Sequence, residues 1–251
     1  MFDDIKIFIP TKGRLDNQKT YDILVSLGLK PVLVVEPQEH ERATALGFPH
    51  LTLPLNNQGI VYVRNFILSY CREKDIKYCV MIDDDVNYFG KTDFVKKKVI
   101  KDNTAFLSAL DYFHKAKMSG GMEYVQFAWA GKKPVTFNKG FQVCHFLYLP
   151  NIPKNLWYDV PNKEDKDFGI ALLMNGVETF NLVACAISVP SIGTNKGGLN
   201  EMYANKEDNI GAVNLQNKWG SDIIELVHKK DGRIDANIKW RKIKQIVGLT
   251  R

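Results

Sequence analysis

Short apolar runs alternate with amphipathic stretches through the first part of the chain. Apolar runs predict strands at residues 5–9, 32–35 and 51–53. Between them, residues 17–27 and 39–46 carry apolar positions at roughly helical spacing, and Gly28 can supply the left-handed stop of the first helix. Strands that alternate with helices in this way are typical of a parallel sheet in an α/β fold.

A longer helix is expected next, because Val63, Phe66 and Ile67 fall at i, i+3 and i+4. This spacing leaves Arg64 and Asn65 in what we predict to be its first turn. The second half of the chain is less regular. We expect a basic loop at 89–101, a helix after Asp102 or Asn103, strands at 124–130, 143–149 and 182–189, and a terminal hairpin of 223–228 with 234–239.

A buried strand that runs straight into three carboxylates is the central feature of the sequence. Residues 78–82 are all apolar or aromatic, which predicts a central strand, and Asp83, Asp84 and Asp85 follow at its carboxyl end. Ligands bind at that edge of an open α/β sheet. Three adjacent carboxylates repel one another unless a cation lies among them. Asp83 and Asp85 alternate, so both can present oxygens to one Mg²⁺ or Mn²⁺. The alternative is that these three residues form a polar loop or cap a helix, although a helix cap needs one carboxylate and not three.

Other polar residues follow the predicted strands at the same edge. They are Pro10, Thr11, Lys12, Arg14 and Glu36. Lys12 and Arg14 are suited to phosphates, and Glu36 can accept hydrogen bonds from a ribose or base. Arg64 can pair with a second phosphate in bidentate fashion. Each residue alone is a weak signal, because loop lysines and arginines are usually only solvated.

A second acidic stretch, at residues 162–169, leads into a predicted helix that ends at Gly176. Capping and the helix dipole favour carboxylates in the first turn of a helix. These effects explain part of the acidic stretch but do not require all three of its carboxylates. A carboxylate that projects from this helix start toward a metal-holding sheet edge is well placed as a general base. Beyond it, the Gly-rich loop at 191–198 is suited to close over a diphosphate, with Lys196 supplying charge.

Composition indicates one large globular domain. The chain has 251 residues, of which 45% are hydrophobic and 25% charged. Four cysteines in apolar contexts, with no CxxC pair, are typical of a reduced cytosolic protein. The sequence lacks both a signal-peptide pattern and an apolar run of 18 residues. We therefore expect a cytoplasmic location, no membrane association and no obligate protein partner.

The net charge of +6 permits an anionic partner, although a lysine-rich solvated surface is the commoner cause of such a charge. Basic residues cluster at 96–98, 132–133 and 239–244. Nucleic acid is therefore one candidate partner. A non-catalytic nucleic-acid-binding module would explain this charge but not the two acidic clusters.

Taken together, these residues resemble a known enzyme class. The Pro-Thr-Lys-Gly-Arg loop at 10–14, the strand ending in Glu36, the Arg64-Asn65 helix and the Asp83-Asp84-Asp85 end look like a GT-A glycosyltransferase that uses nucleotide-diphospho-sugars. The box at 164–168 is similar to the acceptor-site pattern of many inverting members. Within that fold, the chain most resembles the TET-associated glycosyltransferases, bacteriophage enzymes that glycosylate hydroxymethylated DNA bases.

This resemblance implies a single GT-A domain over residues 1–251, with a mostly parallel central sheet and the terminal hairpin as an extension. The donor half covers about 1–90 and the acceptor half about 91–251. A UDP-sugar would be the donor, and 5-hydroxymethylcytosine in double-stranded phage DNA the acceptor, in the host cytoplasm. A polysaccharide or small glycan is the alternative acceptor.

The resemblance also implies roles for particular residues. Asp165, with Glu164 beside it, would act as catalytic base. Mn²⁺ or Mg²⁺ would be held by Asp83 and Asp85, with His228 as the one late histidine available for a third ligand. The implied nucleotide-sugar-binding set is Pro10, Thr11, Lys12, Arg14, Glu36, Arg64, Asn65, Asp84 and Lys196.

Overall fold

The structure is a computed structural model and describes residues 2–190 and 208–249. The predicted Lys196 loop therefore lies outside the described residues. The described strands are β1 (Ile5–Pro10), β2 (Val32–Val35), β3 (His50–Thr52), β4 (Tyr78–Ile82), β5 (Tyr88–Asp93), β6 (Lys98–Lys101), β7 (Ser119–Tyr124), β8 (Val135–Phe137), β9 (Cys144–Tyr148), β10 (Thr179–Ser188), β11 (Ile224–His228) and β12 (Ile234–Ile238).

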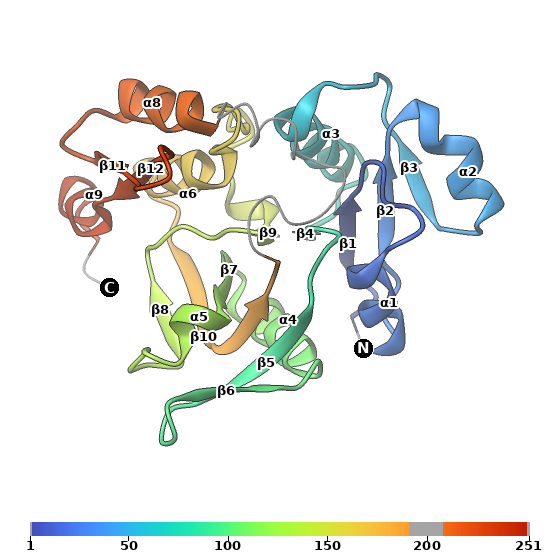
Figure 1. Ribbon diagram of the computed structural model, residues 1–251, viewed down its shortest axis with the longest axis horizontal. Coiled ribbons are helices and arrows are strands. Elements are labelled where there is room, and N and C mark those ends of the chain that lie inside the picture. Colours follow the sequence, from blue (N-terminus) through green and yellow to red (C-terminus); the bar gives the residue numbers. More distant parts are fainter. Residues whose placement is uncertain (1, 191–207, 250–251) are drawn as a thin grey trace.

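Helices connect or cover these strands, as Figure 1 shows. They are α1 (Lys19–Ser26), α2 (His40–Ala45), α3 (Gly59–Glu73), α4 (Ala105–Ala116), α5 (Val125–Ala128), α6 (Glu164–Met174), α8 (Asp208–Trp219) and α9 (Trp240–Val247), with short 3₁₀ turns η1 (Pro37–Glu39) and η2 (Leu149–Asn151). None of the described helices is both long and apolar enough to cross a membrane.

One ten-stranded sheet organises the molecule, in the order β3-β2-β1-β4-β9-β7-β10-β5-β6, with β8 also paired to β10. The described pairings show that β9, β5 and β8 run against the other strands, so the sheet is mostly parallel. This confirms the α/β class with a mostly parallel central sheet. The antiparallel β11–β12 hairpin confirms the predicted C-terminal extension.

The strand β4 is buried on both of its faces, as its apolar sequence predicts. Val80 and Ile82 belong to one core, which also contains residues of α1 and α4. Cys79 and Met81 belong to the opposite core, together with residues of α3 and α6. Helices therefore cover both sides of the sheet, and the carboxyl end of β4 emerges between two packed layers.

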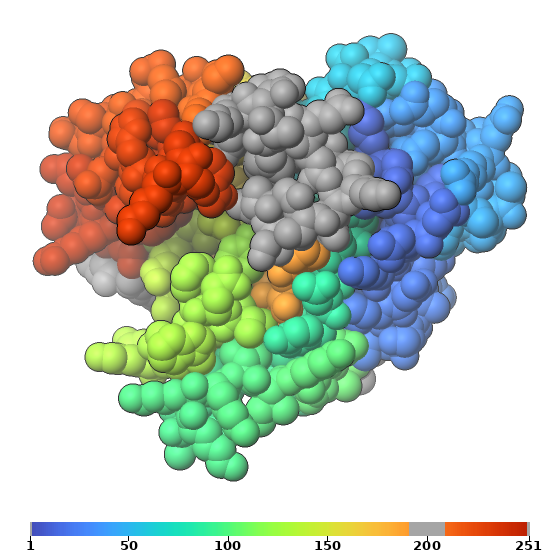
Figure 2. Space-filling view, in the orientation of Figure 1, coloured from blue at the N-terminus to red at the C-terminus, as the bar shows by residue number. Residues whose placement is uncertain are grey.

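A third, smaller core holds the C-terminal elements in place. Ile170 and Leu173 of α6 pack there with residues of α8, the β11–β12 hairpin and α9. In Figures 1 and 2 these orange and red elements form one side of the molecule, away from the blue β1–β2 region. The helix α6 thus contributes to both the central core and this C-terminal layer.

Three local predictions were wrong. The expected loop at 89–101 contains the β5–β6 hairpin, and the expected strand at 124–130 is β7 followed by the short helix α5. The helix α3 begins at Gly59, so Arg64 and Asn65 lie beyond its first turn. Lysines and glycines weaken the apolar pattern of β5–β6 and β7. The helix α3 begins at a glycine, which is a poor helix former and gives no sign of a helix start.

Candidate functional site

The middle carboxylate after β4 holds the loop that follows β1. Asp84 is buried and accepts hydrogen bonds from Thr11 Oγ1 at 2.7 Å and from Arg14 Nη1 at 2.6 Å. Burial alone lowers the pKa of Arg14, but the charge and hydrogen bond of Asp84 outweigh it and raise that pKa. Gln18 also donates to Thr11 Oγ1, at 2.8 Å. The loop after Pro10 is therefore fixed against the end of β4.

The outer carboxylates, Asp83 and Asp85, remain partly accessible. Their side chains are 37% and 24% exposed, compared with 5% for Asp84. Asp85 pairs with Arg14 Nη1 at 3.2 Å, and Asp83 pairs with Arg64 Nη2 at 3.3 Å. Burial, together with the charges of Asp85 and Asp84, raises the pKa of Asp83 to about 7 against the opposing charge of Arg64. A cation at this edge would relieve that repulsion.

Arg64 joins the end of β4 to the start of α6. Its side chain is buried in α3, and its Nε donates to Glu164 Oε1 at 3.2 Å while its Nη2 faces Asp83. Its Nη1 is buried without a partner among the described residues. Burial raises the pKa of Glu164, although the charge of Arg64 opposes that rise. The first acidic residue of the box is therefore buried and paired with Arg64.

The other two acidic residues of the box have different surroundings. Asp165 is partly exposed, and its Oδ1 accepts from the amide of Lys166 at 2.7 Å. Asp167 is fully buried and accepts from Trp219 Nε1 at 2.7 Å and from Lys218 Nζ at 2.9 Å. Asp165 is thus the one carboxylate of this box that is partly open to a ligand, whereas Asp167 ties α6 to α8.

Residues predicted to bind a nucleotide form a second group beside β2. Glu36 is buried and accepts from the Asn57 amide and from Gln38 Nε2, each at 2.8 Å. Lys12, which is 41% exposed on its side chain, pairs with Glu36 at 3.2 Å. Lys12 also donates to Asn57 Oδ1 at 2.5 Å, so Lys12 and Glu36 lie side by side at the sheet edge with the Lys12 side chain partly exposed.

Asn65 has an internal role that the sequence did not reveal. Its amide donates to the carbonyl of Tyr158 and its carbonyl accepts from the Tyr158 amide, both at 2.9 Å. The Tyr158 ring stacks on Phe168 at 4.0 Å, and its hydroxyl contacts His145 Nδ1 at 2.7 Å. Burial, and then the charge of Arg64, lowers the pKa of His145 well below its usual value. The loop before α6 is thereby anchored on α3 and β9.

The donor set at the end of β4 fits a hard divalent cation in part. Asp83 and Asp85 supply carboxylate oxygens with exposed surface, which suits Mg²⁺ or Mn²⁺ that keeps water and phosphate ligands. His228 does not join them, because it is exposed at the end of β11 and the described residues include no group of three metal-binding side chains. A cation here would rest on two carboxylates, with phosphates completing its shell.

Comparisons with known proteins add a family match. Residues 5–198 match the family model described as TAGT, TET-Associated Glycosyltransferase. The matched range contains both acidic clusters and every described residue of the site except His228 and the α8 contacts. A comparison with curated proteins gave no match.

Several solved structures match this chain at low identity. A197 from STIV is 15% identical, with a TM-score of 0.43 over 73% of this chain and 83% of that chain. Mannose-1-phosphate geranyltransferase from Thermus thermophilus is 14% identical, with a TM-score of 0.36 over 55% of this chain and 46% of that one. CMP:2-keto-3-deoxy-manno-octonic acid synthetase complexed with CTP is 10% identical, with a TM-score of 0.42 over 85% of this chain and 99% of that chain.

Proposed function

Because the chain belongs to the TET-associated glycosyltransferase family, we propose that it moves a sugar from a UDP-sugar to the 5-hydroxymethyl group of cytosine in bacteriophage DNA. The enzyme class follows from the family. The donor, the metal and the DNA acceptor are the proposed parts. One observation supports a site that joins donor and acceptor: Arg64 contacts both Asp83 and Glu164, so the end of β4 lies next to the start of α6.

The donor would bind along the carboxyl ends of β1, β2 and β4. Lys12 and Arg14 face that edge and can neutralise the diphosphate, while Glu36 can accept from the ribose or uracil. Asp84 holds Arg14 in place through its 2.6 Å hydrogen bond. Asp83 and Asp85 would hold Mg²⁺ or Mn²⁺. When bound, that ion supplies positive charge to the departing diphosphate.

Asp165 is the proposed general base. It would take the proton from the acceptor hydroxyl as the hydroxyl oxygen bonds to the anomeric carbon. The bond from that carbon to the diphosphate breaks, and UDP leaves with the electron pair. Glu164 is buried against Arg64 and would fix the start of α6, so that Asp165 faces the reacting atoms. A product of retained configuration would remove this role from Asp165.

The donor site can be tested by calorimetry with UDP, in Mn²⁺ and in EDTA. We expect tight UDP binding only with the metal, and loss of that metal dependence in Asp85→Asn. The matched control is Asp111→Asn, because Asp111 is an exposed residue of α4 whose carboxylate pairs with Lys115. UDP binding that is equally strong in EDTA, or unchanged in Asp85→Asn, would overturn the metal assignment.

A further inference from the structure

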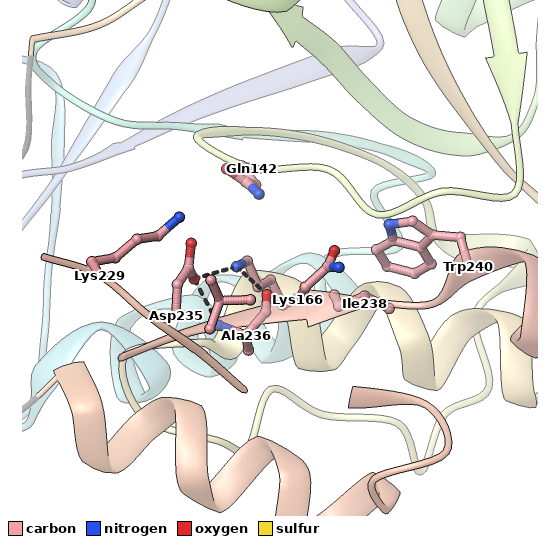
Figure 3. Close-up of a pocket in the computed structure, with 9 residues that line it drawn as sticks. Gln142, Lys166, Lys229, Asp235, Ala236, Ile238 and Trp240 are labelled. Carbon is pink, nitrogen blue, oxygen red and sulfur yellow. Dashed lines mark hydrogen bonds and ion pairs between the residues drawn. The ribbon is translucent and has the colours of Figure 1, made fainter. Parts of the chain in front are cut away.

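Two adjoining cavities lie between the C-terminal layer and the β7–β10 part of the sheet. Their volumes are about 420 and 210 Å³, and they share Gln142, Lys166 and Trp240. In Figure 3, Lys229 and Trp240 stand on opposite sides of the larger cavity, Gln142 lies above it, and the paired Lys166 and Asp235 lie below. Neither cavity is lined by Arg14 or the three aspartates after β4, so this pair is separate from the proposed donor edge.

Trp240 forms an aromatic wall whose position is set by glycines. A Cβ on Gly140 would lie 2.7 Å from the indole, and a Cβ on Gly169 would lie 3.7 Å from it. The indole therefore packs directly against the backbone at Gly140, where a side chain would displace it, and lies within ordinary contact distance of Gly169. A fixed indole beside an open cavity provides a stacking surface for a flat ligand.

The smaller cavity contains a buried hydrogen-bonding group that lacks a partner. Asn181 is 5% exposed, and its Nδ2 donates to Glu123 Oε2 at 2.8 Å. Its Oδ1 has no hydrogen-bond partner among the described residues. Such a buried acceptor costs free energy unless a ligand or water supplies a donor. The exocyclic amine of cytosine is a donor of this kind, and Gln142 adds a second amide at the cavity.

Positive charge lies at both cavities. Lys166 pairs with Asp235 at 2.9 Å, but Lys229 and Lys139 add further ammonium groups to the two linings. Each lining therefore carries lysine side chains whose ammonium groups can meet a phosphate.

Two lining residues are close in sequence to residues of the proposed reacting centre. Lys166, which lines both, directly follows Asp165 in α6. Gln142 directly precedes Val143, whose carbonyl accepts a hydrogen bond from the Asp83 amide at 3.1 Å. The cavity lining is therefore continuous in sequence with Asp165 in α6, and it is connected to the end of β4 by the hydrogen bond between Val143 and Asp83.

We propose that these two cavities hold the acceptor nucleotide after it is extruded from the DNA helix. The pyrimidine stacks on Trp240 with its amine toward Asn181 and Gln142, and the flanking phosphates meet Lys229 and Lys139. This inference rests on the proposed function, since it takes a hydroxymethylated DNA base as the acceptor. An enzyme that extrudes its target base from the duplex needs a pocket that receives the base by stacking and hydrogen bonds, which these two cavities offer. A neutral glycan would also stack on an indole but gives no reason for the lysines.

The test combines a flipping probe with transfer kinetics. A duplex carries 5-hydroxymethylcytosine next to 2-aminopurine, whose fluorescence rises when its neighbour leaves the stack. Wild-type enzyme should raise this signal, and Trp240→Leu should abolish the rise and increase KM for DNA about tenfold or more, as expected for lost base stacking. Trp240→Phe retains a ring and should restore most of the signal.

Matched variants separate the cavity from general effects. Lys229→Gln should weaken the complex with the extruded base several-fold. Lys230→Gln is the matched control and should not weaken it, because Lys230 is an exposed neighbour that lines neither cavity. Trp157→Leu removes an indole that packs on Arg72 and should leave flipping unchanged. Wild-type transfer to DNA together with an unchanged signal in both Trp240→Leu and Lys229→Gln would overturn this inference alone. Failure of wild-type enzyme to modify DNA would overturn the proposed function and this inference with it.

Discussion

Asp83, Asp84 and Asp85 have different partners, and this difference decides which of them can meet a ligand. Asp84 is held internally by Thr11 and Arg14, whereas the two flanking carboxylates keep exposed surface. Side chains alternate in direction along a strand, which predicted that Asp83 and Asp85 would share one side and that Asp84 would not. The partners themselves were not predictable, because Arg64 and Glu164 are 100 residues apart in sequence and only the packing of α3 on α6 brings them together.

The acidic box allows a direct test of the proposed base. Asp165→Asn preserves the size of a partly exposed side chain, so the melting temperature should change little. If Asp165 removes the acceptor proton, kcat for transfer should fall by about 10²-fold or more, while UDP affinity is retained. Steady-state kinetics and calorimetry on the same preparation measure both quantities. A kcat within a factor of a few of wild type would exclude Asp165 as the base.

Asp167 should behave in the opposite way, because its role is structural. Asp167→Ala leaves the Trp219 N–H and the Lys218 ammonium without their buried acceptor, which we expect to cost about 2–3 kcal/mol of unfolding free energy. Asp159→Ala is the matched control. Asp159 contacts the same ammonium from an exposed position and should cost less than about 1 kcal/mol. Urea unfolding measures both, and equal losses would contradict the assignment.

At the scale of elements, hydrophobic periodicity predicted the strands and helices that have a clear buried face. It predicted β1, β2, β4 and α6 within a residue or two. It missed β7, whose Ser-Gly-Gly start carries almost no side chain to show a pattern. The reason lies in the packing, since Gly120 meets Phe180 and Gly121 meets Phe141 at distances that exclude a Cβ. Such contacts are long-range and leave no local sequence signal.

Gly120→Ala tests this explanation of β7. A Cβ there would lie 2.2 Å from the carbonyl oxygen of Phe180 in the neighbouring strand β10, and backbone atoms cannot rotate away. We expect a loss of about 1–3 kcal/mol or more, the range for overpacked cores. Chemical denaturation compared with wild type measures it. An alanine variant as stable as wild type would show that β7 and β10 are not packed this closely.

If DNA is the acceptor, as proposed, the exposed lysines of the β5–β6 hairpin can add nonspecific affinity for it. The hairpin projects from the lower edge of the molecule in Figures 1 and 2, with Lys96, Lys97 and Lys98 exposed at or near its turn. Apparent DNA affinity should fall with salt at a log–log slope of roughly −0.9 per phosphate neutralised. Replacing the three lysines with alanine should flatten that slope without altering UDP affinity. An unchanged slope in fluorescence anisotropy titrations would exclude the hairpin from the DNA contact.

At the scale of the whole molecule, α6 links the parts of the proposed active site. Its start meets Arg64 and the end of β4, its middle packs in the central core, and its far side packs with α8, α9 and the hairpin. The sequence predicted the sheet and the terminal hairpin separately. It did not predict that the hairpin and α9 form, together with α6, the walls of a cavity, because Trp240 has no periodic pattern that relates it to Gly140 or Asn181.

Transfer of labelled sugar is the most direct test of the proposed reaction. Wild-type enzyme is incubated with Mn²⁺, a panel of radiolabelled UDP-sugars and three acceptors in competition: hydroxymethylcytosine duplex DNA, unmodified duplex DNA and a glycan mixture. We expect label from one UDP-sugar to enter the hydroxymethylated DNA alone, and Asp85→Asn to abolish its incorporation. Faster transfer to the glycans, or equal labelling of unmodified DNA, would contradict a hydroxymethylated base as the acceptor.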